Sequence, residues 1–122
     1  MFEGQAEEAM MFYVSLIPNS KVIAVERYGA DGPGPEGTII TATASLGGLD
    51  VMFSDSFVQH AFTFTPSTSL YVTCASETEI DALSTAFAEG GEILMPLGDY
   101  GFSRKFAWVN DRFGVSWQLT LP

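Results

Sequence analysis

Hydrophobic residues recur at spacings of three and four between Gln5 and Ile17, which predicts a helix with one apolar face. The apolar positions are Ala6, Ala9, Met10, Tyr13, Val14 and Ile17. Glu3, Glu7 and Glu8 place negative charge near the start of this segment, where it interacts favourably with the helix dipole. Pro18, Asn19 and Ser20 follow and end the predicted helix.

Three strands are predicted after this helix. The first covers Val22 to Tyr28. A segment rich in β-branched residues, Thr38 to Leu46, is separated from Leu49 to Ser54 by Gly47-Gly48, which is typical of a hairpin. The first half of the chain is therefore predicted as helix, strand, strand, strand.

The second half repeats this order behind an additional strand, Ser69 to Cys74. Ser76 and Glu79 have the spacing of a capping box, which predicts the start of a helix that continues to Gly90-Gly91. The segments that follow are a short strand at 92–95, a loop from Pro96 to Phe102, and a hairpin of 104–109 with 115–121. The first half has only Met1 to Gly4 before its helix, so we expect Met1-Phe2 to be the end of a strand whose beginning lies upstream.

A βαβββ unit that recurs within one short chain indicates duplication. Three segments resemble the PhnB-like branch, often labelled 3-demethylubiquinone methyltransferase-like, of the vicinal oxygen chelate superfamily of glyoxalases and bleomycin-resistance proteins. They are residues 2–9 with Phe12-Tyr13, the segment from Phe62 to Pro66, and the tail Trp108-Val109-Asn110-Asp111-Arg112-Phe113-Gly114-Val115-Ser116-Trp117-Gln118. The resemblance covers essentially the whole chain, and the tail is its most specific part.

The resemblance implies an α+β fold in which two βαβββ modules, 1–66 and 67–122, form curved mixed sheets around a cavity within one domain. Most of the first strand of the first module would be missing. The resemblance also implies a homodimer, and the content of 47% hydrophobic and 13% aromatic residues favours self-association, because so small a domain cannot bury all ten Phe side chains. We expect the function to lie in a pocket that the two halves enclose.

The net charge of −10 repels phosphate backbones and anionic membranes, so neither nucleic acid nor a membrane is expected as a partner. No apolar segment approaches the ~20 residues that span a bilayer, and the acidic N-terminus does not resemble a signal peptide. We therefore expect a cytoplasmic protein. The single cysteine, Cys74, is expected to be a small buried residue at a strand end.

Members of the superfamily that use a metal hold it with His, Glu or Gln on strands that face the cavity. Here Ser69 or Thr68 stands where a His is expected, and Gln118 stands where a Glu is usual. Because these donors are weak ligands for a divalent ion, no metal site and no cofactor are predicted. A divalent metal at an atypical site is the alternative.

His60, the only histidine, follows Asp55 by five residues. Asp55 and His60 are candidate catalytic residues, because a carboxylate can orient an imidazole that acts as a general base. The alternative is a surface histidine near an unrelated aspartate. Residues 32–37 formally match the dinucleotide pattern G-x-G-x-x-G, but two of its positions are proline and a strand follows, so a stiffened loop is predicted. Without a glycine-rich loop for S-adenosylmethionine, methyltransferase activity is not expected.

The predicted lining of the pocket is mainly aromatic. It consists of Phe62, Phe64, Tyr100, Phe106, Trp108 and Gln118. Strand alternation places Phe106 and Trp108 on one face, which is either core or cavity. The main hypothesis is a protein that binds a small apolar or aromatic molecule without a metal. A glyoxalase- or dioxygenase-type enzyme acting on a small oxygenated substrate, and a structural or interaction protein, are the alternatives.

Overall fold

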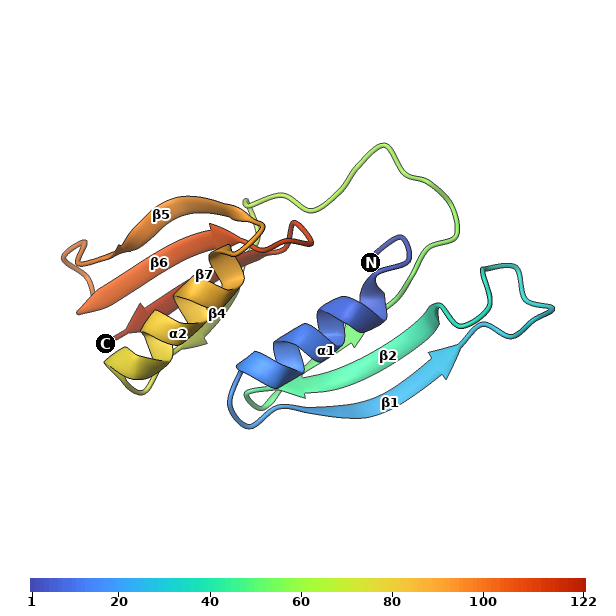
Figure 1. Ribbon diagram of the computed structural model, residues 1–122, viewed down its shortest axis with the longest axis horizontal. Helices are drawn as coiled ribbons and strands as arrows, with labels where there is room; N and C mark the ends of the chain where they lie inside the picture. Colours follow the sequence, from blue (N-terminus) through green and yellow to red (C-terminus); the bar gives the residue numbers. More distant parts are fainter. The chain divides into compact units, whose positions relative to one another are not determined.

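A computed structural model describes all 122 residues, and the chain divides into two compact units, 1–61 and 62–122 (Figure 1). The predicted boundary between modules, after residue 66, lies in the segment 54–69, which has neither helix nor extended strand. The elements are α1 (Ala6–Leu16), β1 (Lys21–Arg27), β2 (Ile39–Leu46), β3 (Leu49–Phe53), β4 (Leu70–Thr73), α2 (Glu77–Ala88), β5 (Glu92–Gly98), β6 (Lys105–Asn110) and β7 (Ser116–Leu121). The predicted α+β class is confirmed.

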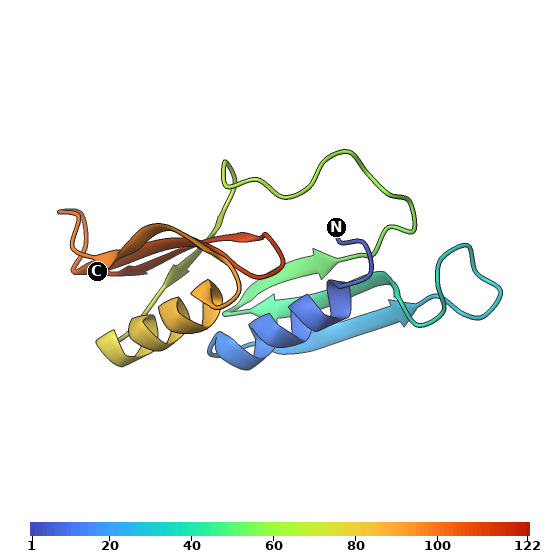
Figure 2. The ribbon, with the colours of Figure 1, turned by 45° about the horizontal axis from the view of Figure 1, so that its top comes forward.

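In the first unit, α1 covers one face of a three-stranded antiparallel sheet of order β1-β2-β3 (Figures 1 and 2). The helix buries Ala9, Met10 and Tyr13 on this side, as its apolar spacing predicts. β2 presents Ala42 and Ala44, which are fully buried. Since alanine side chains are short, the helix and the central strand can approach each other closely. The apolar face of α1 therefore forms the core of this unit.

The hairpin of β2 and β3 turns at Gly47 and Gly48, as predicted. Both residues have positive φ values, 59° and 95°, which glycine adopts without steric cost. A two-residue turn with two positive φ angles matches the right-handed twist of the paired strands. This turn fixes the register in which Leu46 lies opposite Leu49.

Phe2 forms a parallel bridge with Asp55, just beyond the end of β3. Its N–H donates to the carbonyl of Ser54 at 2.8 Å. In the second unit the N–H of Cys74, at the end of β4, donates to the carbonyl of Thr120 on β7 at 2.7 Å. Phe2 thus takes in the first unit the place that the end of β4 takes in the second.

In the second unit, α2 covers one face of a four-stranded sheet of order β4-β7-β6-β5, in which β4 is parallel to β7 (Figures 1 and 2). The predicted capping box is confirmed: Ser76 Oγ accepts the N–H of Glu79 at 3.1 Å, and Glu79 Oε2 accepts the N–H of Ala75 at 2.7 Å. Ile80, Leu83 and Phe87 form the buried face of the helix.

The predicted end of β5 at Met95 is wrong, because the strand continues through Pro96 and Leu97 to Gly98. β5 is an edge strand of its sheet. An edge strand tolerates proline, since one side of the strand needs no N–H donor for a neighbour. The loop that was expected to begin at Pro96 therefore begins only after Gly98. Neither helix of the protein is long and apolar enough to cross a membrane.

Candidate functional site

The sheet of the second unit has one face covered by α2 and one face turned away from it. Trp117 on β7 faces the helix, because its ring stacks on Phe87 of α2 with 4.6 Å between ring centroids and 17° between planes. Alternation along β7 then turns Ser116 and Gln118 to the opposite face, which we call the open face. Gln118 is only partly exposed on this face.

Trp108 on β6 lies directly opposite Gln118 on β7. Residues opposite each other in an antiparallel pair share a face, so the structure brings these two candidate residues together on the open face. Phe106, two positions before Trp108, belongs to the same face, as strand alternation predicts. The open face therefore offers an indole and an amide side by side.

A chain of hydrogen bonds crosses the open face from β6 to the start of β4. The indole N–H of Trp108 donates to Ser116 Oγ at 2.8 Å, and Ser116 Oγ lies 2.6 Å from Ser69 Oγ. Sequence reasoning did not find Ser116, although it shares strand parity with Gln118. The sequence indicates for Ser69 only that it stands where a metal-binding His is expected. In the structure its hydroxyl is hydrogen-bonded to Ser116, which in turn accepts from Trp108.

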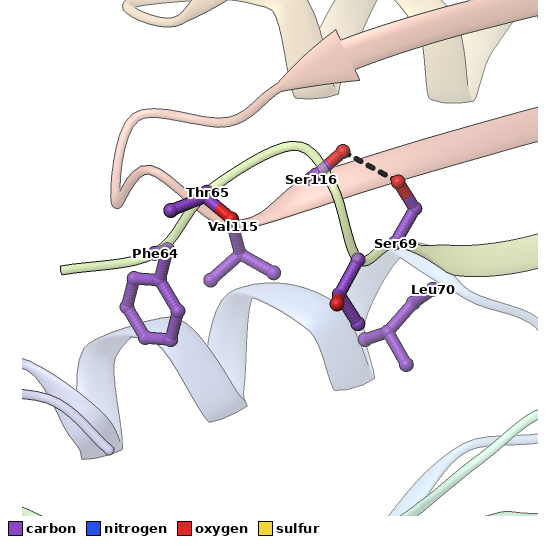
Figure 3. Close-up of a pocket in the computed structure, with 7 residues that line it drawn as sticks. Phe64, Thr65, Ser69, Leu70, Val115 and Ser116 are labelled. Carbon is purple, nitrogen blue, oxygen red and sulfur yellow. Dashed lines mark hydrogen bonds between the residues drawn. The ribbon is translucent and has the colours of Figure 1, made fainter.

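A cavity of about 260 Å³ lies beside this group (Figure 3). Its lining consists of Phe64, Thr65, Thr68, Ser69, Leu70, Val115 and Ser116. Figure 3 shows the two serines joined by their hydrogen bond, with Phe64, Leu70 and Val115 as apolar neighbours. Phe64 is thus a predicted pocket residue that lines a cavity. The cavity combines an apolar lining with hydroxyl groups, one of which is hydrogen-bonded to the indole of Trp108.

The other predicted pocket aromatics lie elsewhere. Tyr100 and Phe102 both pack edge-on against Phe106, with centroid distances of 6.1 and 4.9 Å. These contacts bury Phe106 to 4% exposure. Phe62 is 65% exposed and does not line the cavity beside Ser69. Tyr100 and Phe106 therefore form a cluster with Phe102 at the other end of β6, away from the cavity beside Ser69 and Ser116.

Asp55 and His60 are directed to different partners. The Asp55 carboxylate is buried and accepts the backbone N–H groups of Gly4, Ala6 and Ile39, each at 2.9 Å. His60 Nε2 lies 2.9 Å from Ser56 Oγ. Asp55 thereby links the start of α1 to the start of β2. Asp55 therefore has a structural role in the first unit. A catalytic role for Asp55 or His60 stays a prediction.

Residues 1–120 match the profile of the family described as 3-demethylubiquinone-9 3-methyltransferase. The chain belongs to this family. A search of curated proteins found no match.

Several solved structures are similar to this chain. A PhnB protein from Bacillus cereus that bears the same methyltransferase name is 58% identical, with a TM-score of 0.97 over 100% of this chain and 95% of that one. A protein from Pseudomonas aeruginosa is 29% identical, with a TM-score of 0.84 over 98% of this chain and 91% of that one. TioX from Micromonospora sp. ML1 is 17% identical, with a TM-score of 0.56 over 99% and 91%, and resembles the chain in fold alone.

The word methyltransferase in the description of this 3-demethylubiquinone-9 3-methyltransferase family is a legacy name and assigns no activity.

In this chain the glycine- and proline-rich segment 29–37 folds around the ring of Tyr28. Tyr28 donates its N–H to the carbonyl of Thr38 and accepts the N–H of Gly37, both at 2.9 Å. Gly34 lies so close to the ring that an added Cβ would be 2.9 Å from two of its carbons. The segment is thus packed around its own side chain, as expected for a connecting loop.

The donors beside the cavity fit a divalent metal poorly. Ser69 stands where the resemblance to metal-using relatives implies a His, and its hydroxyl is hydrogen-bonded to Ser116. Hydroxyl, indole and amide groups are weak ligands compared with imidazole and carboxylate. No group of three or more His, Cys, Asp or Glu side chains is placed to hold an ion. No chemical step is therefore derived through a metal.

Proposed function

We propose that this PhnB-like protein is a vicinal oxygen chelate protein that binds a small apolar or aromatic molecule without a typical metal triad. The observation that carries the proposal is the cavity beside Ser69 and Ser116, with its apolar lining and its short chain of ordered hydroxyl groups. Ligand sites in proteins commonly combine these two features, an apolar lining for affinity and a few fixed polar groups for orientation.

The order of the strands supports the placement in this superfamily. The second unit runs β4-α2-β5-β6-β7 along the chain, with β4 and β7 as parallel neighbours in the sheet. The first unit repeats this arrangement with β3, β2 and β1, and Phe2 takes the place of the additional strand. The resemblance of the sequence implies two βαβββ modules with this strand order.

The size of the cavity limits the ligand. A volume of about 260 Å³ lies just below the range of ~300–1,000 Å³ that is usual for drug-sized molecules. A single substituted ring fits this volume better than a fused ring system. Phe64, Leu70 and Val115 supply the apolar contact surface for such a ring.

The test is a thermal-shift and calorimetric titration with single-ring compounds, using the wild type, Val115→Phe and Val25→Phe. The Phe side chain at 115 fills the cavity, whereas Val25 lies on β1 and does not line it. A ligand at 100 times its Kd stabilises the native state by ~2.7 kcal/mol, so binding raises the melting temperature of the wild type and of Val25→Phe. Equal responses of all three proteins, or none in the wild type, would contradict the proposal.

We also infer that two copies associate. Large apolar side chains that are at least half exposed occur in both units, among them Met52, Phe57, Phe62 and Phe102. β1 and β5 are edge strands of their sheets. Exposed apolar groups and unpaired edges are commonly covered by self-association. Light scattering coupled to gel filtration is expected to report twice the mass of 13.2 kDa, and a single-chain mass at micromolar concentration would refute the inference.

A further inference from the structure

The hydrogen bonds from Trp108 through Ser116 to Ser69 have one direction. An indole N–H can only donate, so Ser116 Oγ accepts from Trp108 Nε1. Ser116 is 2% exposed, and Ser69 Oγ is its second partner. If Ser69 donated to Ser116, the proton of Ser116 would be buried without an acceptor, which is unfavourable. Ser116 therefore donates to Ser69.

One other acceptor lies near Ser116. Asn110 is the residue opposite Ser116 on β6, and it carries an amide oxygen. Asn110 Oδ1 is buried and has no hydrogen-bond partner, so it does not accept the proton of Ser116. The direction from Trp108 to Ser69 is unchanged by this neighbour.

Ser69 consequently accepts a hydrogen bond and retains its own proton for another partner. Ser116 Oγ is the protein atom with which the Ser69 hydroxyl bonds, and there Ser69 acts as the acceptor. Ser69 is half-buried and lines the cavity together with Phe64, Leu70 and Val115. Its O–H is thus a donor available to a molecule in the cavity, whose lining also includes the hydroxyl residues Thr65, Thr68 and Ser116 (Figure 3).

We propose that Ser69 is the polar anchor of this cavity and selects single-ring ligands that carry a neutral hydrogen-bond acceptor, such as a carbonyl or nitro oxygen. This inference rests on the proposed function, since it concerns the same cavity. Hydrogen bonds in series polarise one another, so the donors behind Ser69 strengthen its own donation. The net charge of −10 favours neutral acceptors over anionic ones.

The test compares acetophenone with isopropylbenzene, which has the same number of heavy atoms but no acceptor. Binding is followed through the indole N–H signal of Trp108 in NMR titrations, and the buried Trp117 indole, which bonds to Asp111, serves as internal reference. Relative to isopropylbenzene, the wild type is expected to bind acetophenone about 3- to 10-fold more tightly than Ser69→Ala does, the value of one hydrogen bond. In Ser69→Ala the carbonyl of acetophenone meets no donor, so this variant is expected to favour isopropylbenzene. Ser103→Ala, which removes a partly buried hydroxyl elsewhere in the unit, is expected to keep the wild-type ratio of the two affinities.

The outcomes separate the two proposals. A ratio of the two affinities that is the same in the wild type and in Ser69→Ala overturns the role of Ser69 and leaves the binding function in place. A preference for acetophenone that persists in Ser69→Ala assigns the donor to another group and also overturns the inference. If neither compound binds at millimolar concentration, both the anchor and the proposed binding function are refuted.

Discussion

The indole N–H of Trp117 donates to the carboxylate of Asp111 at 2.9 Å, in the buried interior of the second unit. The other oxygen of the same carboxylate accepts the backbone N–H groups of Phe113 and Val115. The carboxylate of Asp111 therefore stabilises both the turn between β6 and β7 and the buried side chain of Trp117.

Asp111→Asn is expected to destabilise the protein by about 2 kcal/mol, because the amide can present an N–H group to the N–H of Trp117 where an acceptor is required. In a Trp117→Phe background, the same substitution is expected to cost much less. Urea unfolding of the four proteins of this double-mutant cycle measures the coupling. Additive effects of the two substitutions would show that the hydrogen bond contributes nothing.

Gly91 packs directly against the backbone of β6. A Cβ atom at this position would lie 2.0 Å from the carbonyl oxygen of Asn110, so Gly91→Ala is expected to cost about 3 kcal/mol through forced displacement of the strand. Gly29→Ala is the matched control, because nothing lies within 4 Å of its added Cβ. Its free energy of unfolding, measured with urea, is expected to stay within ~0.5 kcal/mol of the wild type. Equal losses at both sites would refute the steric argument.

Cys74 is buried as predicted, and burial, with a smaller contribution from the charge of Glu79, raises the pKa of its thiol to about 11. The thiolate is the reactive form, so native protein at pH 8 is expected to react with a disulfide reagent at least ~100-fold more slowly than unfolded protein. Similar rates in the two states would contradict the burial.

The same thiol makes stability depend on pH. The unfolded chain releases this proton near pH 9 and the native protein only near pH 11, so between these values the native state binds more protons. The contribution of Cys74 to the free energy of unfolding therefore falls as the pH rises through this window. Urea midpoints at pH 8 and pH 10.5 are expected to differ more in the wild type than in Cys74→Ala. An identical difference in both proteins would refute the linkage.

Asp55→Ala is expected to cost about 3 kcal/mol, because three backbone N–H groups lose a buried, charged acceptor. Asp50→Ala, at an exposed position of β3, is the matched control and is expected to change stability by less than ~0.5 kcal/mol. Amide exchange at Ala6 and Ile39 is expected to increase only in Asp55→Ala. Unchanged exchange at both amides would contradict the assignment.

Elemental analysis of the purified protein is expected to find no stoichiometric divalent metal, and added Mn²⁺, Ni²⁺, Zn²⁺ or Fe²⁺ is expected to leave the melting temperature unchanged. The reason is the weak donor set at Ser69 and Gln118. Stoichiometric metal with a raised melting temperature would contradict a metal-free pocket and favour the enzyme alternative.

Features that depend on neighbours in sequence were predictable, whereas those that depend on distant segments were not. The capping box of Ser76 and Glu79 and the turn at Gly47 and Gly48 each lie within a few residues, and both were predicted correctly. Pro96 was misjudged because its tolerance depends on the position of β5 at the sheet edge, which the local sequence does not reveal.

In the candidate site, too, only the features that depend on sequence neighbours were predictable. Strand alternation was sufficient to place Phe106 and Trp108 on one face. The partners of Asp55 lie 16 to 51 residues away along the chain, so no local pattern indicates its task. Likewise, 47 residues separate Ser69 from Ser116, and only the parallel pairing of β4 with β7 brings their hydroxyls together.

The two helices begin in different ways, and we expect this difference to affect the order in which the two halves fold. The first turn of α2 is closed by Ser76 and Glu79, which are adjacent to it in sequence, so this helix can start before the sheet exists. The residue that precedes α1 provides no side-chain cap. The N–H of Ala6, at the start of this helix, instead donates to Asp55, which follows the hairpin of β2 and β3 in the sequence. Closing such a long loop slows folding, so the second half is expected to acquire protected helical amides earlier than the first.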